Sequence, residues 1–224
     1  MIRVHSLEQS RSQRVVWLLE ELGEAYELVT YRRDPETLRA PAALREVHPL
    51  GKSPVISDEA RGGRVIAESG AIVDYLLARH PESDLLPPAG SDAYERYRFW
   101  LHHAEGSAMP PLVMSLVFSR LGKPPVPALI RPIGALLAKG VHRAYLGPEL
   151  VTLREFWEAS LASGWFAGEH FSAADIQMSF PVLAMASRGG LDDAPRLRAF
   201  LEAIRARPAY QRAVDNAGEF GVLD

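Results

Sequence analysis

Two serines near the start of the chain are the first residues whose spacing suggests chemistry. Ser10 and Ser12 lie in the segment 10–14, between a predicted strand and a predicted helix. Where a strand end meets a helix start, unsatisfied N–H groups and the positive end of the helix dipole face a ligand, which suits an anion or a thiolate. Either serine could instead be only the N-cap of the helix, and for this segment alone that interpretation is favoured.

A second polar segment, residues 48–55, leads into a predicted hairpin. Taken singly, Lys52 is typical of a solvated surface charge, His48 of a loop histidine, and Pro54 of a proline that opens a strand. The sequence predicts no metal site, because the chain has no cysteine and its histidines are scattered.

Glu68 and Ser69 stand at the junction of a predicted strand and a predicted helix. Ser69 could be the N-cap of that helix, and Glu68 an ordinary acid beside the cap. Together the two residues also suit an amino acid, whose ammonium group can meet Glu68. Its carboxylate would then meet the hydroxyl and the amide of Ser69.

The segment Phe171–Ile176 has the pattern of a helix start. Ser172, followed three residues later by Asp175, is the spacing of a capping box, in which two backbone N–H groups are satisfied reciprocally. We expect this segment to serve folding and not catalysis.

The elements that must position these residues change in kind along the chain. Apolar patterns predict strands at 2–7 and 26–31 around a helix at 15–22. A short helix, a hairpin through 55–56 and 65–66, and a helix ending at 80–81 are expected to follow. The first unit is therefore predicted to be β-α-β-(α)-β-β-α.

Residues 81–90 are rich in proline and have the composition of a linker. After this stretch the apolar residues recur only at helical spacing. Apolar stripes from about residue 94 onward indicate an all-helical second unit. The paired prolines 110–111 and the stretch 123–127 are expected to bend or break the first of its helices, because proline removes a backbone donor.

Composition excludes several classes of function. The chain has 224 residues, 25 Lys+Arg against 28 Asp+Glu, and a formal charge of −3, so nothing attracts nucleic acid over the whole surface. The absence of cysteine removes disulfides, thiolate metal sites and cysteine nucleophiles. No signal-like or membrane-length apolar run is present, so a cytoplasmic protein that does not enter membranes is expected.

Taken in this order, the four segments resemble the glutathione transferase superfamily over essentially the whole chain. The resemblance implies a thioredoxin-like glutathione-binding domain at 1–81, an all-helical domain at 91–224 that contributes the electrophile pocket, and a homodimer. The opening Ser-Arg-Ser-x-Arg and the helical segment 104–107 look most like bacterial and fungal serine-type members.

The resemblance also implies roles for individual residues. Pro54 would be a cis-proline, and the backbone of Ser53 would pair with the cysteinyl part of glutathione. Lys52 would approach the glycyl carboxylate or the peptide backbone, while Glu68 and Ser69 would hold the γ-glutamyl end.

The thiol would face a serine hydroxyl. Ser10 stands four residues before Arg14, as the catalytic serine does in related classes, but Ser12 lies close enough to exchange with it in an alignment. A hydroxyl that donates to sulfur would favour the thiolate without a general base.

The electrophile pocket is expected on the first helices of the second unit, where five apolar residues are candidates: Met109, Leu112, Val113, Leu116 and Phe118. The leading interpretation is an enzyme that conjugates glutathione, as co-substrate and without a metal, to small hydrophobic electrophiles in detoxification. Two alternatives stay open at this point: a glutathione-dependent peroxidase or dehalogenase, and a non-catalytic interaction module of the same fold.

Overall fold

Strand β1 lies in the middle of a four-stranded sheet whose order is β2-β1-β3-β4. The computed structural model describes residues 1–218 and residue 221. Strand β1 runs parallel to β2 and antiparallel to β3, and β3 forms an antiparallel hairpin with β4. The strands are β1 (Ile2–Leu7), β2 (Tyr26–Tyr31), β3 (Val55–Asp58) and β4 (Arg64–Ala67).

Three α-helices accompany this sheet: α1 (Ser12–Leu22), α2 (Ala43–Val47) and α3 (Ser69–Leu77). The order β-α-β-α-β-β-α of the prediction is confirmed, and Gly23 closes α1 with the positive φ of 63° expected for it. The start of α1 differs from the prediction, since the helix begins at Ser12 and not at residue 15. Its first turn is polar and yet buried, so hydrophobic periodicity does not reveal it.

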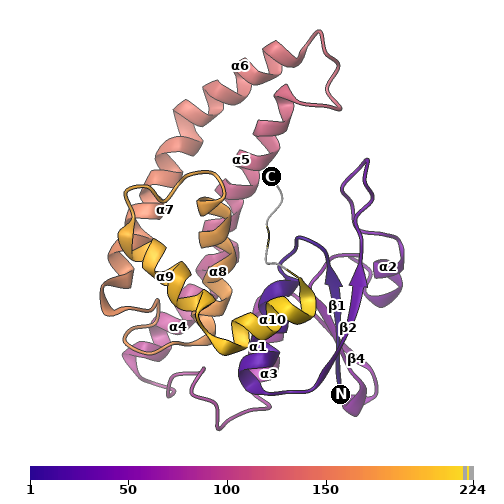
Figure 1. Cartoon of the computed structure of the whole chain (residues 1–224), viewed down its shortest axis with the longest axis vertical. Helices are drawn as coiled ribbons and strands as arrows, with labels where there is room; N and C mark the ends of the chain where they lie inside the picture. The colour runs from indigo at the N-terminus through magenta and orange to yellow at the C-terminus, as the bar shows by residue number, and fades with distance from the viewer. Residues whose placement is uncertain (219–220, 222–224) are drawn as a thin grey trace.

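The rest of the chain is helical, as predicted, and packs beside the sheet unit (Figure 1). Helices α5 and α6 form an arm that projects from the remaining helices (Figure 1). The helices are α4 (Asp92–His103), α5 (Met109–Ser119), α6 (Arg131–Val141), α7 (Gly147–Ser160), α8 (Ala173–Ala186), α9 (Pro195–Arg205) and α10 (Pro208–Ala217).

The prolines 110–111 do not break the first long helix as expected. A π-helical turn, Ala104–Ala108, joins α4 directly to α5, and both prolines fall in the first turn of α5. Proline is well tolerated in the first turn of a helix, and here the π-helical turn directly precedes that turn. The stretch around 123–127 does separate α5 from α6, as the sequence predicts.

Helix α8 is the centre of the helical unit, and its residues 173–185 are all buried. The predicted box at its start is present: the Asp175 carboxylate accepts hydrogen bonds from Ser172 N and from Phe166 N, each at 2.8 Å. Burial raises the pKa of Asp175 to about 6, and these hydrogen bonds oppose the rise. The segment therefore serves folding, as expected.

The stretch from 78 to 91 lies between α3 and α4 and contains the predicted linker. The limits 1–81 and 91–224 stay our proposal for the two domains. Residues 219–220 and 222–224 of the second domain lie outside the described residues.

A buried carboxylate ties α3 to the sheet and so fixes where Ser69, the first residue of α3, lies. Asp58 accepts hydrogen bonds from Tyr75 Oη at 2.5 Å, from Arg79 at 2.6 Å and from Ala60 N at 3.0 Å. Burial alone would raise the pKa of the Asp58 carboxyl, but the Tyr75 hydrogen bond and the Arg79 charge hold it below its ordinary value.

We expect Asp58→Asn to lower the free energy of unfolding by about 2 kcal/mol at pH 7, because buried partners lose a charged acceptor. The pKa of Asp58 is lower in the folded protein than its ordinary value of 3.8, so its ionised carboxylate stabilises the fold fully at pH values above 3.8. This stabilisation is lost as the pH falls through the pKa of the folded protein. Denaturant unfolding of both proteins at several pH values should therefore show the difference shrinking in acid. Asp215→Asn, on the exposed side of α10, is the control, and a loss that is independent of pH would contradict the assignment.

Candidate functional site

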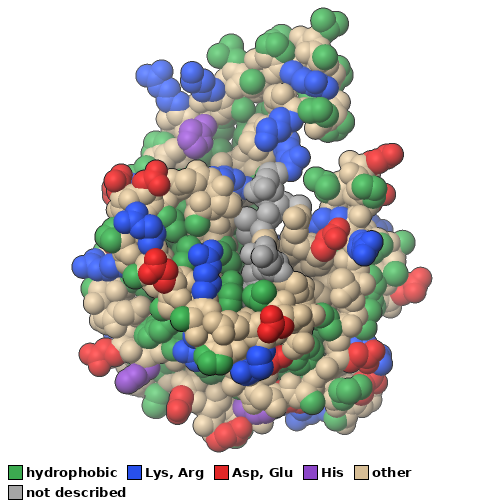
Figure 2. All heavy atoms as spheres, viewed as in Figure 1, with side chains coloured by type: hydrophobic (Ala, Val, Ile, Leu, Met, Phe, Trp, Pro, Cys, Tyr) green, Lys and Arg blue, Asp and Glu red, His purple; other side chains and the backbone are tan. Residues whose placement is uncertain are grey.

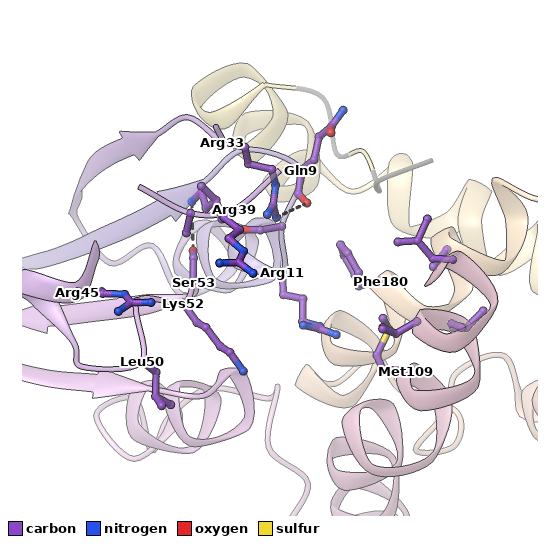
Figure 3. A pocket seen from close by; sticks show the side chains of 18 of the residues that line it. Gln9, Arg11, Arg33, Arg39, Arg45, Leu50, Lys52, Ser53, Met109 and Phe180 are labelled. Atoms are coloured by element: carbon purple, nitrogen blue, oxygen red, sulfur yellow. Dashed lines mark hydrogen bonds between the residues drawn. The ribbon is translucent and has the colours of Figure 1, made fainter. Parts of the chain in front are cut away.

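A cavity of about 520 Å³ opens between the sheet unit and the helical unit. One wall comes from the loops that follow β1 and precede β3, and the facing wall from α5 and α8 (Figure 3). The residues that line it are Leu7, Gln9, Ser10, Arg11, Arg33, Arg39, Ala40, Arg45, Leu50, Gly51, Lys52, Ser53, Met109, Leu112, Val113, Leu116, Phe180, Ala184 and Arg188. Its size and its mixed lining are those of a small-molecule site.

The two serines of the opening segment have different positions. Ser10 lines the cavity, whereas Ser12 is fully buried behind it and is not a lining residue. Neither residue is the N-cap of α1, which is Arg11, with no side-chain capping bond. The interpretation of these serines as helix caps is therefore wrong.

Three buried hydroxyls form a chain that leads to the cavity. Ser6 Oγ and Ser12 Oγ are 2.8 Å apart, and Ser12 Oγ and Ser10 Oγ are also 2.8 Å apart. The backbone N–H of Ser12 donates to Ser10 Oγ at 3.3 Å. Sequence reasoning missed Ser6 because a serine inside a strand gives no signal until the sheet brings it beneath α1.

Lys52 and Ser53 line the cavity where the chain enters β3. The Ser53 hydroxyl donates to His5 O at 2.8 Å and accepts from Leu7 N at 3.1 Å, which fixes the segment against β1. The pairing of β1 with β3 ends at His5 and Val55, so the backbone of Ser53 lies just beyond it. The Ser53–Pro54 peptide bond is cis, as the resemblance implies.

Glu68 and Ser69 do not line this cavity but begin α3 behind it. Glu68 is the N-cap, with no capping bond from its side chain and a φ of 71°, a value uncommon for residues other than glycine. Ser69 is the first helical residue and not the cap that could be expected. Such strained residues are frequent at ligand sites, where the surrounding structure over-determines them.

The Ser69 hydroxyl has a defined direction. Its oxygen accepts from Gln177 Nε2 at 3.0 Å and from Arg14 at 3.4 Å. A hydroxyl has two acceptor positions and one proton, so these two bonds leave the O–H of Ser69 as a donor. The residue can therefore present a proton to an anionic group.

Arg14, in the first turn of α1, contacts residues of α3, α8 and the π-helical turn. Its guanidinium is buried, donates to Gln177 O at 2.6 Å, and forms a short ion pair with Glu105 of the π-helical turn. Burial lowers the pKa of Arg14, and the charge of Glu105 opposes that shift. Glu105 also pairs with Arg11 at 3.2 Å, so one carboxylate faces two guanidinium groups.

Four of the five apolar residues predicted for the electrophile pocket line the cavity: Met109, Leu112, Val113 and Leu116. Phe118 is not among the residues that line this cavity. Sequence reasoning missed Phe180 and Ala184, because α8 has the pattern of a uniformly apolar core helix until the fold exposes one face of it to the cavity. It also missed Arg188, which lies just after the end of α8.

The described residues contain no group of His, Asp and Glu side chains that could hold a metal ion. Over the same residues, no helix has both the length and the apolar character that crossing a bilayer requires.

Known proteins resemble this chain in both sequence and fold. Residues 10–79 match the model of the glutathione S-transferase N-terminal domain family. The chain is 32% identical to glutathione S-transferase 1 of Saccharomyces cerevisiae, over 99% of this chain and 97% of the yeast protein. It is 36% identical to glutathione S-transferase 3 of Schizosaccharomyces pombe, over 96% and 87% of the two chains.

Solved structures of glutathione S-transferases also resemble this chain. A glutathione S-transferase from Actinobacillus pleuropneumoniae is 34% identical, has a TM-score of 0.78, and is matched over 100% of this chain and 95% of its own. A sphingomonad glutathione S-transferase complexed with glutathione has the same fold, at 23% identity and a TM-score of 0.71, over 96% of this chain and 98% of its own. The structure has the fold of these neighbours, a thioredoxin-like domain followed by a helical domain. The chain belongs to the glutathione transferase superfamily and is a transferase.

We expect Arg14→Met to lower the free energy of unfolding by about 3 to 5 kcal/mol, because it breaks a buried ion pair with Glu105 and removes the side-chain donor to Gln177 O. Arg212→Met, which removes an exposed partner of Glu20, is the matched control and should cost less than about 1 kcal/mol. Denaturant unfolding measures both values. Equal, small losses would mean that the buried pair does not hold the two units together.

Proposed function

We propose that the protein conjugates the thiolate of glutathione to small hydrophobic electrophiles, in the manner of serine-type members of the superfamily. The observation that carries this proposal is Ser10, which lines the same cavity as the apolar residues of α5 and α8 and whose hydroxyl is backed by two further hydroxyls. The cytoplasm, a homodimer and a role in detoxification belong to the same proposal and rest on the family alone.

Glutathione would lie along the sheet side of the cavity. The backbone of Ser53, just beyond the β1–β3 pairing, would add the cysteinyl part as a further strand, with Pro54 holding that turn. Lys52 would meet the glycyl carboxylate. At the other end, Glu68 would meet the γ-glutamyl ammonium group, and the Ser69 O–H would donate to its carboxylate.

Ser10 would then stabilise the thiolate, with Ser12 as a positioning residue. Each hydroxyl has one proton, so a Ser10 that donates to sulfur is free to accept from Ser12. The Ser12 hydroxyl would then donate to Ser10 Oγ at 2.8 Å in place of the longer bond to Leu7 O at 3.3 Å, and would accept from Ser6. The Ser12 N–H supports the same direction by donating to Ser10. A free thiol has a pKa of about 8.5, and a donor held in place before the reaction favours the charged form near pH 7.

The transfer itself needs no further group from the chain. The sulfur lone pair forms a bond to the electrophilic carbon, the leaving group departs with its electron pair, and the thiol proton has already passed to solvent. The apolar residues of α5 and α8 would hold the electrophile beside the sulfur and exclude water from it.

We expect Ser10→Ala to lower kcat about 10- to 100-fold, because a hydrogen bond to a charged group contributes about 1.5 to 3 kcal/mol. The pKa of the bound thiol should rise, and glutathione affinity should change little. Ser12→Ala should raise the same pKa by less. Steady-state kinetics with an aryl halide, and ultraviolet titration of the thiolate in the complex, measure both effects.

Glutathione binding by calorimetry separates the proposed role of Ser10 from a failure to bind. Full activity in Ser10→Ala together with a large loss in Ser12→Ala would transfer the catalytic role to Ser12. No glutathione binding by the unaltered protein would overturn the proposed function.

We expect Ser69→Ala to weaken glutathione binding about tenfold and to leave kcat nearly unchanged, because the γ-glutamyl carboxylate is remote from the reacting sulfur. Ser179→Ala is the matched control, a buried serine whose hydroxyl donates only within α8. Calorimetry gives the affinities. An unchanged affinity in Ser69→Ala would place the γ-glutamyl end elsewhere.

A further inference from the structure

Arg11 stands at the middle of the cavity. It follows Ser10 directly, and its side chain extends between Lys52 on one side and Met109 and Phe180 on the other (Figure 3). About a third of the side chain is exposed, and its guanidinium carbon lies 5.8 Å from the centre of the Phe180 ring. A cation therefore borders the apolar wall on which an electrophile would lie.

Among the described residues, the charge of Arg11 is balanced only in part. Its acidic partner, Glu105, uses one oxygen for Arg14 and the other for Arg11. Two guanidinium groups and one carboxylate leave a net positive charge in this cluster. Because Arg14 is buried, the excess faces the cavity through Arg11.

The other charged residues that the structure describes along the cavity are also basic. Six lining residues are basic and none of the described lining residues is acidic; the basic ones are Arg11, Arg33, Arg39, Arg45, Lys52 and Arg188. Arg33 is bound to backbone carbonyls, including Leu38 O at 2.9 Å, and so supports the loop. Arg188 extends from the end of α8, donates to Leu112 O at 3.3 Å, and adds positive charge on the apolar side.

The cavity has more positive charge than the glycyl carboxylate of glutathione would need. Lys52, Arg39 and Arg45 lie on the loop side of the cavity, where the glycyl carboxylate would lie (Figure 3). Arg11 and Arg188 instead border the apolar residues of α5 and α8. The view of Figure 2 also shows basic side chains near the hollow between the α5–α6 arm and the sheet unit.

We propose that the second substrate is an apolar electrophile that carries an anionic group, of the carboxylate class, and that Arg11, assisted by Arg188, determines this specificity. The inference rests on the proposed function and deepens it. The apolar body of the substrate packs on Met109, Leu112 and Phe180, while its carboxylate pairs with the guanidinium of Arg11.

A matched pair of substrates tests the charge alone. 4-Chloro-3-nitrobenzoate and 4-chloro-3-nitrobenzamide have the same leaving group and nearly the same shape, and only the first is an anion at pH 7. In both, the sulfur–carbon bond forms and chloride leaves with its electron pair. Each kcat/KM is divided by the rate of the uncatalysed reaction with glutathione, which removes the difference in intrinsic reactivity.

We expect the corrected kcat/KM to favour the benzoate about five- to tenfold, as a partly exposed ion pair gives about 1 kcal/mol. The preference should fall with added salt. Arg11→Met should abolish it by lowering the benzoate value alone, Arg11→Lys should keep most of it, and Arg188→Met should reduce it. Arg143→Met, an exposed arginine outside the cavity, removes the same charge and should change neither value.

The outcomes are distinct. An unaltered protein that converts both substrates equally well overturns this inference and leaves the proposed function standing, whereas conversion of neither overturns both. If Arg11→Met lowers the two values by the same factor, Arg11 acts on the thiolate and the inference is again wrong. Circular dichroism and thermal unfolding of Arg11→Met identify a variant that is misfolded, in which case Arg11→Gln and Arg188→Met decide the question.

Discussion

The buried guanidinium of Arg14 is the interaction on which the site depends. It reaches from the first turn of α1 to Gln177 O in α8, to the Ser69 hydroxyl at the start of α3, and to Glu105 in the π-helical turn. A buried charge must be paired and hydrogen-bonded at every donor that can be satisfied, so these distant segments hold one another in a single arrangement.

The serine chain follows from that arrangement. Because α1 begins at Ser12 and its first turn lies against β1, Ser12 is enclosed between Ser6 and Ser10 and has no route to the cavity. Only Ser10 lies at the surface of the cavity. A site that must hold a thiolate in water benefits from a donor whose direction is set by buried neighbours, since no reorganisation is then needed when the sulfur becomes charged.

Charged and apolar side chains line different walls of the cavity. The basic residues come mainly from the loops around β1 and β3 and from α2, and α5 with α8 provide an apolar wall. The π-helical turn brings Glu105 toward both Arg11 and Arg14, and π-helical turns are often found at functional sites. One carboxylate, Glu105, is thus shared between Arg11, which lines the cavity, and Arg14, which is buried.

The sequence by itself determined the order of elements, the superfamily and four of the apolar residues on α5, because local periodicity and motif order are properties of neighbouring residues. It could not separate Ser10 from Ser12, assign Phe118, or identify Ser6 and Phe180. These depend on which residues the fold brings together across long stretches of chain. The pairing of Arg14 with Glu105 spans 91 positions, and that with Gln177 spans 163, so only the packed structure decided them. Polar residues that are buried together give no periodic signal in a single sequence.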